Sequence, residues 1–215
     1  MALILPSIKT NHYLTKQKKM KAISLIASLV VMLSVQAFSQ KLNVDPVKSK
    51  IHWTGKKIVG NSHNGELKVK SGVLEVKNDQ ITKGNIVVDM NSMTNLDLED
   101  KEYNAKLIGH LKSDDFFSVE KYPTATFNVK KATKFTNGKA TVTGDITIKG
   151  ITKQVSAVIN KGSNNTYTTK LELDRSQFDV RYGSNSFFDN LGDKAIDNTF
   201  VLDITIATNQ LSAKK

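Results

Sequence analysis

The sequence predicts an all-β protein: an eight-stranded antiparallel barrel with a helical insertion between the third and fourth strands. Apolar and polar residues alternate with a period of two over most of the chain after residue 40, which is typical of half-buried strands. Short turns rich in Asn and Gly separate the alternating segments, and Asn137-Gly138 is the strongest hairpin signal among them. Closure into a barrel would remove exposed strand edges, although a β-sandwich also fits this pattern.

Eight segments carry the alternation, and a change of phase marks one of them. In the second segment the apolar positions change parity at Ser71-Gly72, which predicts a β-bulge that bends the strand. Further turns are expected at Asn78-Asp79, at Lys149-Gly150 and over residues 161–165. The alternating apolar residues are, strand by strand, Ile51 and Trp53; Leu67, Val69, Leu74 and Val76; Ile86 and Val88; Ala125, Phe127 and Val129; Val142, Ile146 and Ile148; Val155, Ala157 and Ile159; Tyr167, Leu171 and Leu173; and Phe200, Leu202, Ile204 and Ile206.

The stretch from Asn95 to Ser113 predicts the helix. Tyr103, Leu107 and Leu111 recur every four residues, acidic residues gather near the start, and basic residues gather near the end. Such charges complement the helix dipole. A helix at this point would cover one mouth or one edge of the barrel, with the phenylalanines of the following turn, residues 116 and 117, beside it.

Residues 1–39 predict a signal peptide. Four lysines between residues 16 and 21 precede an apolar run from Ala22 to Phe38, and Ala37-Phe38-Ser39 fits a cleavage site before Gln40. The run is shorter than the roughly 20 residues that a membrane span needs. Met20 would be a normal start for such a leader, so residues 1–19 are either part of it or an over-extended start. Residues 40–215 are expected to form a single domain that is exported to the periplasm or secreted.

Composition excludes several classes of function. The net charge of +11 falls to +6 from Gln40 onward, and Arg175 and Arg181 are the two arginines of the whole chain. Nucleic-acid binding needs a concentrated basic face, so none is expected. The absence of cysteine excludes disulfides, thiolate nucleophiles and cysteine-ligated metals.

Catalytic and metal motifs are not recognisable, so the sequence predicts no enzyme, no catalytic residue, no metal site and no cofactor. His110 and Asp114 lie four residues apart, but two ligands rarely suffice for a metal. His63, in the turn over residues 60–65, is a candidate polar group at a barrel mouth. An enzyme that uses His63, Asp114 or Asp115 at that mouth is the alternative.

A closed eight-stranded barrel is either filled by its own side chains or holds one apolar ligand, and periodicity does not distinguish the two. If the barrel is hollow, inward-facing residues and the insertion would line a tunnel. The predicted lining residues are Trp53, Leu67, Val69, Leu107, Phe116, Phe117, Phe127, Val142, Ile146, Leu171, Phe200, Leu202 and Ile204.

Several local motifs occur in a recognisable order. They are Gly60–Gly65, Val88–Met93, Leu107–Phe117, Lys121–Phe127, Gly144–Lys153 and Leu173–Phe178. Together they resemble the YceI-like family, secreted lipid- and polyisoprenoid-binding proteins of bacteria, over residues 45–208. The sequence departs from that pattern at Asp179, where many relatives carry glycine.

The resemblance implies a lipocalin-like barrel with a long apolar tunnel. The tunnel would hold an isoprenoid such as a quinone or a prenyl phosphate, or another long-chain lipid such as a fatty-acid derivative. The expected role is that of a periplasmic carrier or sequestering protein for apolar lipids, and transient contact with a membrane surface is expected. A homodimer and a monomer stay open as alternatives, and so does a packed barrel that binds nothing.

Overall fold

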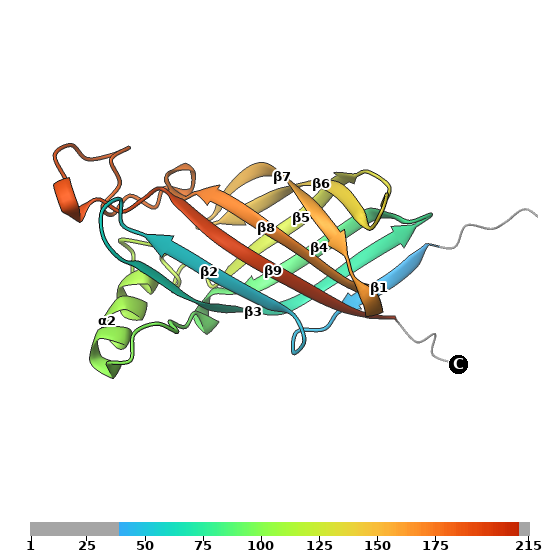
Figure 1. Cartoon of the computed structure of the whole chain (residues 1–215), viewed down its shortest axis with the longest axis horizontal. Coiled ribbons are helices and arrows are strands. Elements are labelled where there is room, and N and C mark those ends of the chain that lie inside the picture. The colour runs from blue at the N-terminus through green and yellow to red at the C-terminus, as the bar shows by residue number, and fades with distance from the viewer. Residues whose placement is uncertain (1–38, 211–215) are drawn as a thin grey trace, which may run out of the picture. The chain divides into compact units, whose positions relative to one another are not determined.

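The computed structural model describes residues 39–210, and these residues form a barrel of antiparallel strands with one α-helix (Figure 1). The predicted signal peptide lies outside them except for Ser39. No helix among the described residues is both long and apolar enough to cross a membrane. The strands are β1 (Gln40–Val44), β2 (Lys50–Lys56), β3 (Ser62–Lys77), β4 (Gln80–Asp89), β5 (Thr124–Ala132), β6 (Lys139–Ile148), β7 (Ile151–Lys161), β8 (Thr166–Asp174) and β9 (Thr199–Gln210).

The barrel is closed by pairing between its first and last long strands. Each strand from β2 to β9 pairs antiparallel with the next one along the chain, and β9 returns to pair with β2. Pairing of this kind gives each of these eight strands a partner on both sides, so the sheet closes on itself. The β-sandwich alternative is therefore excluded, and the predicted eight-stranded antiparallel barrel is confirmed.

Strand β1 was not predicted, and it changes the count of strands before the helix. It pairs with the far part of β3 and with the end of β9, so β1 and β2 occupy one position in the barrel, end to end. The turn between them is held by Asp45, whose Oδ1 accepts hydrogen bonds from the backbone N–H groups of Val47 and Lys48. The helix therefore follows the fourth strand, not the third. With only Leu42 and Val44 alternating, β1 was too short to predict.

The predicted bulge and turns are present. The pairing of β3 with β4 shifts register between Val69 and Ser71, and the buried positions change parity there. Asn78, Asp79, Asn137 and Lys149 all have positive φ, between 50° and 57°. Such dihedrals match the right-handed twist of a hairpin and are tolerated best by Asn, Asp and Gly.

The helix α2 (Lys101–Lys112) starts six residues later than predicted and ends near Ser113, as predicted. The Asp100 side chain caps it by accepting hydrogen bonds from the N–H groups of Glu102 and Tyr103. The residues before Asp100 are held against β3 instead, because the Asn95 side chain donates to the carbonyl of Asn64 at 2.9 Å. A hydrogen bond to β3 therefore holds the residues that were predicted to form the first turns of the helix.

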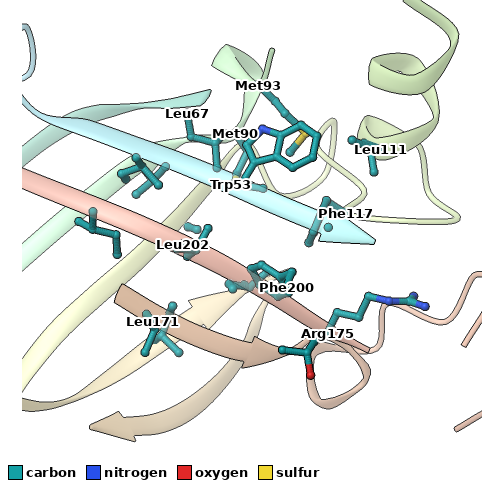
Figure 2. A pocket seen from close by; sticks show the side chains of 18 of the residues that line it. Trp53, Leu67, Met90, Met93, Leu111, Phe117, Leu171, Arg175, Phe200 and Leu202 are labelled. Carbon is teal, nitrogen blue, oxygen red and sulfur yellow. The ribbon is translucent and has the colours of Figure 1, made fainter. Parts of the chain in front are cut away.

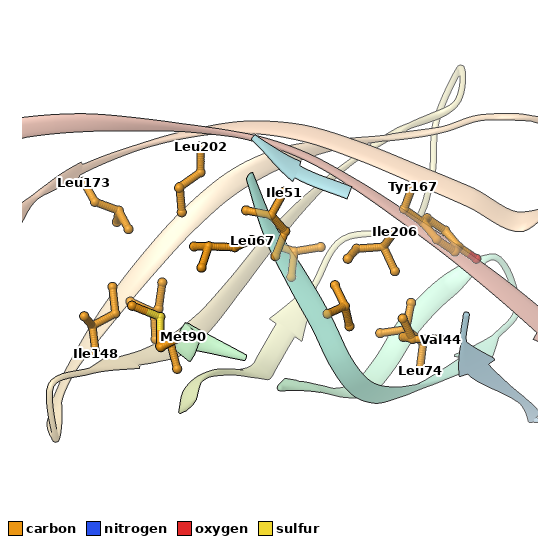
Figure 3. Packing of buried hydrophobic residues seen from close by; sticks show 14 of the residues in the cluster. Val44, Ile51, Leu67, Leu74, Met90, Ile148, Tyr167, Leu173, Leu202 and Ile206 are labelled. Carbon is orange, nitrogen blue, oxygen red and sulfur yellow. The ribbon is translucent and has the colours of Figure 1, made fainter. Parts of the chain in front are cut away.

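One end of the barrel is packed, and it is called the closed end here. It carries the β3–β4 and β5–β6 turns and residues 162–165 between β7 and β8. The ring of Phe135 packs 5.9 Å from that of Tyr167, and Lys161 Nζ lies over the Phe135 ring while pairing with Asp79 at 2.6 Å. Leu74 and Val44 are packed in the same region (Figure 3).

The other end carries the β2–β3 loop, α2 and the long segment between β8 and β9, and it is called the mouth (Figure 1). The connections here are longer and rely on short 3-10 turns, η3 (Arg175–Phe178) and η4 (Gly192–Lys194). Asp179 ends η3 with φ 56°, in the left-handed region. Glycine is favoured in that conformation, and Asp is among the other residues that tolerate it.

Candidate functional site

A cavity of about 420 Å³ occupies the barrel interior and extends to the mouth. Aliphatic and aromatic side chains make up most of its wall. Figure 2 shows Trp53 of β2, Leu171 of β8 and Phe200 and Leu202 of β9 converging on this space. A volume of this size lies within the range of about 300–1,000 Å³ that is usual for small-molecule sites.

The burial of the inward-facing side chains shows that the barrel is hollow rather than packed. Leu171, Phe200 and Ile204 all point inward, yet they are only half-buried. In a filled core such positions would be almost fully buried, because interiors are close-packed. Their exposed surface faces the cavity, so a ligand entering it would cover apolar area that is now uncovered.

Twelve of the thirteen predicted lining residues border the cavity. They are Trp53, Leu67, Leu107, Phe116, Phe117, Phe127, Val142, Ile146, Leu171, Phe200, Leu202 and Ile204. Val69 does not: it is 2% exposed and belongs to the packed core at the bulge, where β3 changes which parity faces inward. That a ligand contacts the twelve stays a prediction.

The prediction missed lining residues in the segments between strands. Met90 and Met93 border the cavity beside the 3-10 turn η1 (Met90–Ser92), and His110, Leu111 and Tyr182 border it at the mouth. The period-two alternation could not identify these residues, because they do not lie on strands. The helical repeat through Leu107 and Leu111 was the available signal for that face of α2.

Trp53 is fixed in the wall by a hydrogen bond that depends on a neighbouring glycine. Its indole Nε1–H donates to the carbonyl of Thr94 at 3.1 Å. A Cβ atom at Gly65, which pairs with Trp53 across the β2–β3 ladder, would lie 1.8 Å from that carbonyl oxygen. Only glycine therefore lets the segment after η1 approach β3 closely enough to hold the indole in place.

Arg175 is buried at the mouth and binds the backbone around it. It is 2% exposed, and its guanidinium donates to the backbone carbonyls of Val180, Tyr182, Ile196 and Asp197 at 2.8–3.0 Å. Burial lowers its pKa, although a guanidinium keeps its proton in proteins. One side chain thus satisfies four carbonyls and ties both ends of the β8–β9 segment together.

Aromatic contacts join this segment to the turn after α2. The His110 ring packs edge-on against Tyr182, with centroids 4.3 Å apart, and against Phe116 at 5.6 Å. The Arg175 guanidinium lies 5.4 Å from the centre of the Phe116 ring. The helix and the β8–β9 segment are therefore in contact with each other at the opening of the cavity.

His63 borders the cavity at the mouth and forms a pair with Asp97. The distance from His63 Nδ1 to Asp97 Oδ2 is 2.7 Å, and both side chains are partly exposed. Burial alone would raise the pKa of Asp97, but hydrogen bonds from the Asn64 N–H, His63 and Asn95 outweigh it, so that pKa lies below its ordinary value of 3.8. An ionised carboxylate on Nδ1 leaves the Nε2 atom of His63 as the polar atom available to a ligand.

Asp114 and Asp115 do not join His63. Both are exposed and neither borders the cavity. Asp114 pairs with Lys121 at 2.8 Å, and hydrogen bonds from Lys121 and Ser118 lower its pKa. Among residues 39–210 there is no group of three or more His, Asp or Glu side chains placed to hold a metal.

The cavity also reaches the seam between β7 and β8. Within the described chain these two strands pair at Asn160–Thr168 and Lys161–Tyr167, near the closed end. Thr168 and Thr169 border the cavity, and the Thr169 hydroxyl donates to the carbonyl of Val158 across the seam at 2.9 Å. This seam is the least extensively paired part of the barrel wall.

Solved structures share this fold. A protein named BcnA from Burkholderia cenocepacia superposes with a TM-score of 0.52 at 23% identity, covering 76% of this chain and 98% of that one. A polyisoprenoid binding domain from Saccharophagus degradans superposes with a TM-score of 0.54 at 12% identity, covering 81% of this chain and all of that domain. At these identities the likeness establishes the architecture.

Sequence comparison with a family model establishes the family, and individual relatives are similar over part or most of the chain. A UPF0312 protein of Vibrio parahaemolyticus is 29% identical over 187 residues, which cover 80% of this chain and 94% of the relative. A UPF0312 protein of Pseudomonas aeruginosa is 36% identical over 87 residues, 40% of this chain and 41% of that protein. The family model described as a YceI-like domain matches residues 42–208, so the chain belongs to the YceI-like family.

Proposed function

We propose that the protein binds one long apolar lipid in the barrel cavity and acts as a carrier or sequestering protein for it. The observation that carries this proposal is the hollow barrel, an apolar cavity of about 420 Å³ that runs to the mouth while the other end is packed. An apolar cavity of about 150 Å³ already binds benzene, so the space here suits a considerably longer hydrocarbon.

The energetics favour recognition by shape. Each buried methylene of the ligand contributes about 0.8 kcal/mol, so a long chain binds tightly without polar contacts. Polar side chains that could meet a headgroup, among them His63, Lys57 and Tyr182, border the cavity. A lipid with its tail in the barrel and its polar end at the mouth would match this distribution.

We propose an isoprenoid as the ligand class. The structural neighbour from Saccharophagus degradans is described as a polyisoprenoid binding domain, which supports this class over an unbranched chain. The branched tail would follow an irregular wall of Met, Phe and Trp side chains such as Met90, Phe117 and Trp53. A fatty-acid derivative is the alternative within the same proposal.

The proposed location is the periplasm, after removal of residues 1–39. Cleavage before Gln40 would leave β1 intact, because that strand starts at Gln40. The intact mass of the exported protein should match Gln40–Lys215. A mass that retains residues 22–38 would contradict cleavage at this site.

A catalytic role at the mouth is the second candidate, and the His63–Asp97 pair is the observation that favours it. A carboxylate that orients a histidine is half of a general-base arrangement. Within the described residues, however, Asp97 is the side chain hydrogen-bonded to His63, and no nucleophile is paired with Nε2. Binding therefore remains the proposed function.

Mass spectrometry of lipids extracted from the protein, purified from its native envelope, tests the proposal. We expect one class of long-chain lipid at close to one equivalent, and we expect that lipid to be unchanged after incubation with the protein. A chemically altered lipid would favour the enzyme. Repeated absence of lipid from native preparations would contradict the carrier.

A further inference from the structure

Exposed apolar side chains gather at the mouth. Seven of the ten large hydrophobic residues that are most exposed among the described residues lie on three segments there, with 39–65% of their surface accessible. They are Ile58 and Val59 of the β2–β3 loop, Leu96 and Tyr103 before and on α2, and Tyr182, Phe187 and Phe188 of the β8–β9 segment. These seven residues are called the apolar rim.

The apolar rim comes from three parts of the chain that are held together at the mouth. The N–H of Ile58 donates to the carbonyl of Ala195, which joins the β2–β3 loop to the β8–β9 segment. The N–H of Leu96 donates to the carbonyl of Asn64, and the contact of His110 with Tyr182 joins α2 to the β8–β9 segment. Figure 1 shows all three at the same end of the barrel. Exposed apolar side chains gathered at one end of a molecule in this way indicate an interaction site.

The segments that carry the apolar rim have nearly balanced charge. Residues 56–61, 95–112 and 179–197 together hold seven basic and eight acidic side chains, whereas the chain from Gln40 onward is basic overall. Several of these bases are also paired locally, as in Lys56–Asp197 at 3.3 Å and Lys106–Glu102 at 2.6 Å. A partner that binds the apolar rim would therefore be met through apolar contacts, not through attraction to an anionic surface.

The cavity indicates what that partner is. The apolar rim lies at the open end (Figure 1) of a cavity that, under the proposed function, holds a lipid drawn from a membrane. Each methylene that passes through water on the way lowers the partition of the lipid by roughly fourfold. A mouth seated in the bilayer interface removes that barrier. Tyr is suited to the interface because its ring is apolar and its hydroxyl is polar, and Phe and Leu can insert into the apolar layer beneath the headgroups.

We propose that the apolar rim docks the barrel, mouth first, on the surface of a zwitterionic lipid bilayer and lets lipid pass directly between membrane and cavity. This inference rests on the proposed function for the identity of the cargo. The docking itself is separable, because Val59, Leu96 and Phe188 do not border the cavity.

Flotation with phosphatidylcholine vesicles tests the docking. The variant Val59→Ser/Leu96→Ser/Phe188→Ser should bind the vesicles at least tenfold more weakly than the wild type. Val47→Ser is the matched control, because Val47 is 90% exposed in the β1–β2 turn, away from the rim. Binding should change little between about 0.1 M and about 1 M salt, although this shortens the Debye length from about 10 Å to about 3 Å.

Transfer of a fluorescent isoprenoid supplies the second measurement and separates the two proposals. The triple variant should load slowly from vesicles and normally from lipid dispersed in detergent. Wild-type protein that floats but never loads would contradict the proposed function and leave docking intact. Wild-type protein that loads from detergent but does not float, or a triple variant that floats as well as the wild type, would overturn docking. Self-association that the triple variant abolishes, without flotation of either protein, would assign the rim to a second copy of the chain.

Discussion

The two ends of the barrel are stabilised in different ways. At the closed end Leu42, Leu74 and Ile81 are almost fully buried, and Phe135 packs over Tyr167. At the mouth the inward side chains border open space, and the structure is held by hydrogen bonds that Arg175 donates to backbone carbonyls and that Asp97 accepts from the Asn64 N–H. The same barrel is therefore a packed core at one end and a polar framework around a cavity at the other.

The difference shows how a protein can keep a hollow interior ordered. Side chains that face an empty cavity have few partners for dispersion contacts, so they cannot fix the backbone behind them. Buried polar groups with satisfied hydrogen bonds can, because breaking them leaves unpaired donors or acceptors. The mouth uses this second kind of stabilisation and leaves its apolar surface free for a ligand.

The largest expected effect comes from Arg175→Met, which removes the centre of the polar framework. Four carbonyls would lose their donor, and each unsatisfied buried group costs about 1–3 kcal/mol, so we expect the free energy of unfolding to fall by at least about 3 kcal/mol. Arg175→Lys should recover only part of this loss, because an ammonium cannot reproduce the guanidinium geometry. Urea unfolding and hydrogen exchange over residues 179–197 measure both.

The matched control for Arg175→Met is Arg181→Met. Arg181 is exposed and pairs with Asp179, and exposed pairs contribute about 0–1 kcal/mol. Equal losses from the two substitutions would show that the carbonyl contacts of Arg175 do not hold the mouth.

Paired truncations compare the ends directly. Leu74→Ala at the closed end should lower the free energy of unfolding by about 2–5 kcal/mol, since it opens a cavity in packed surroundings. Leu171→Ala in the cavity wall should lower it by less than half as much, because Leu171 already borders open space. Chemical denaturation of lipid-free protein measures the two, and equal losses would mean that the barrel is packed throughout.

Strand parity made the closed barrel and most of the cavity wall predictable. It could not reveal that Arg175 is buried, because an arginine after a strand usually lies on the surface. The one signal was compositional, since Arg175 and Arg181 are the two arginines of a lysine-rich chain. Strand parity also could not predict the contact between His63 and Asp97, which is 34 residues away. That contact depends on the extended segment that Asn95 holds against β3.

Leu202→Trp separates lipid binding from stability. Leu202 lies opposite Trp53 and Leu171 and faces the cavity, so the larger ring can occupy space that a ligand would use. We expect at most about 1 kcal/mol of destabilisation in lipid-free protein, and a sharp fall in bound lipid. Leu74→Trp at the closed end should show the reverse, with about 1–3 kcal/mol lost and lipid binding kept.

Asp203→Ala, on the outer face of the same strand as Leu202, should alter stability by no more than about 0.5 kcal/mol and should leave lipid binding unchanged. Isothermal titration with lipid, beside urea unfolding, gives both quantities. Strong destabilisation by Leu202→Trp, or unchanged lipid binding, would show that this position is packed.

The smallest effect concerns the pH dependence of the mouth. Because the folded state lowers the pKa of Asp97 below 3.8, its ionised form stabilises the mouth above that pH. This contribution is lost as the pH falls through the lowered folded value. Asp97→Asn should therefore be less stable than the wild type at neutral pH, by less than about 1 kcal/mol for so exposed a pair, and the gap should close in acid. Urea unfolding of both proteins from neutral pH down to strongly acidic conditions measures it. A gap that stays constant with pH would mean that ionisation of Asp97 does not stabilise the mouth, and that the loss comes from the different hydrogen bonding of the amide.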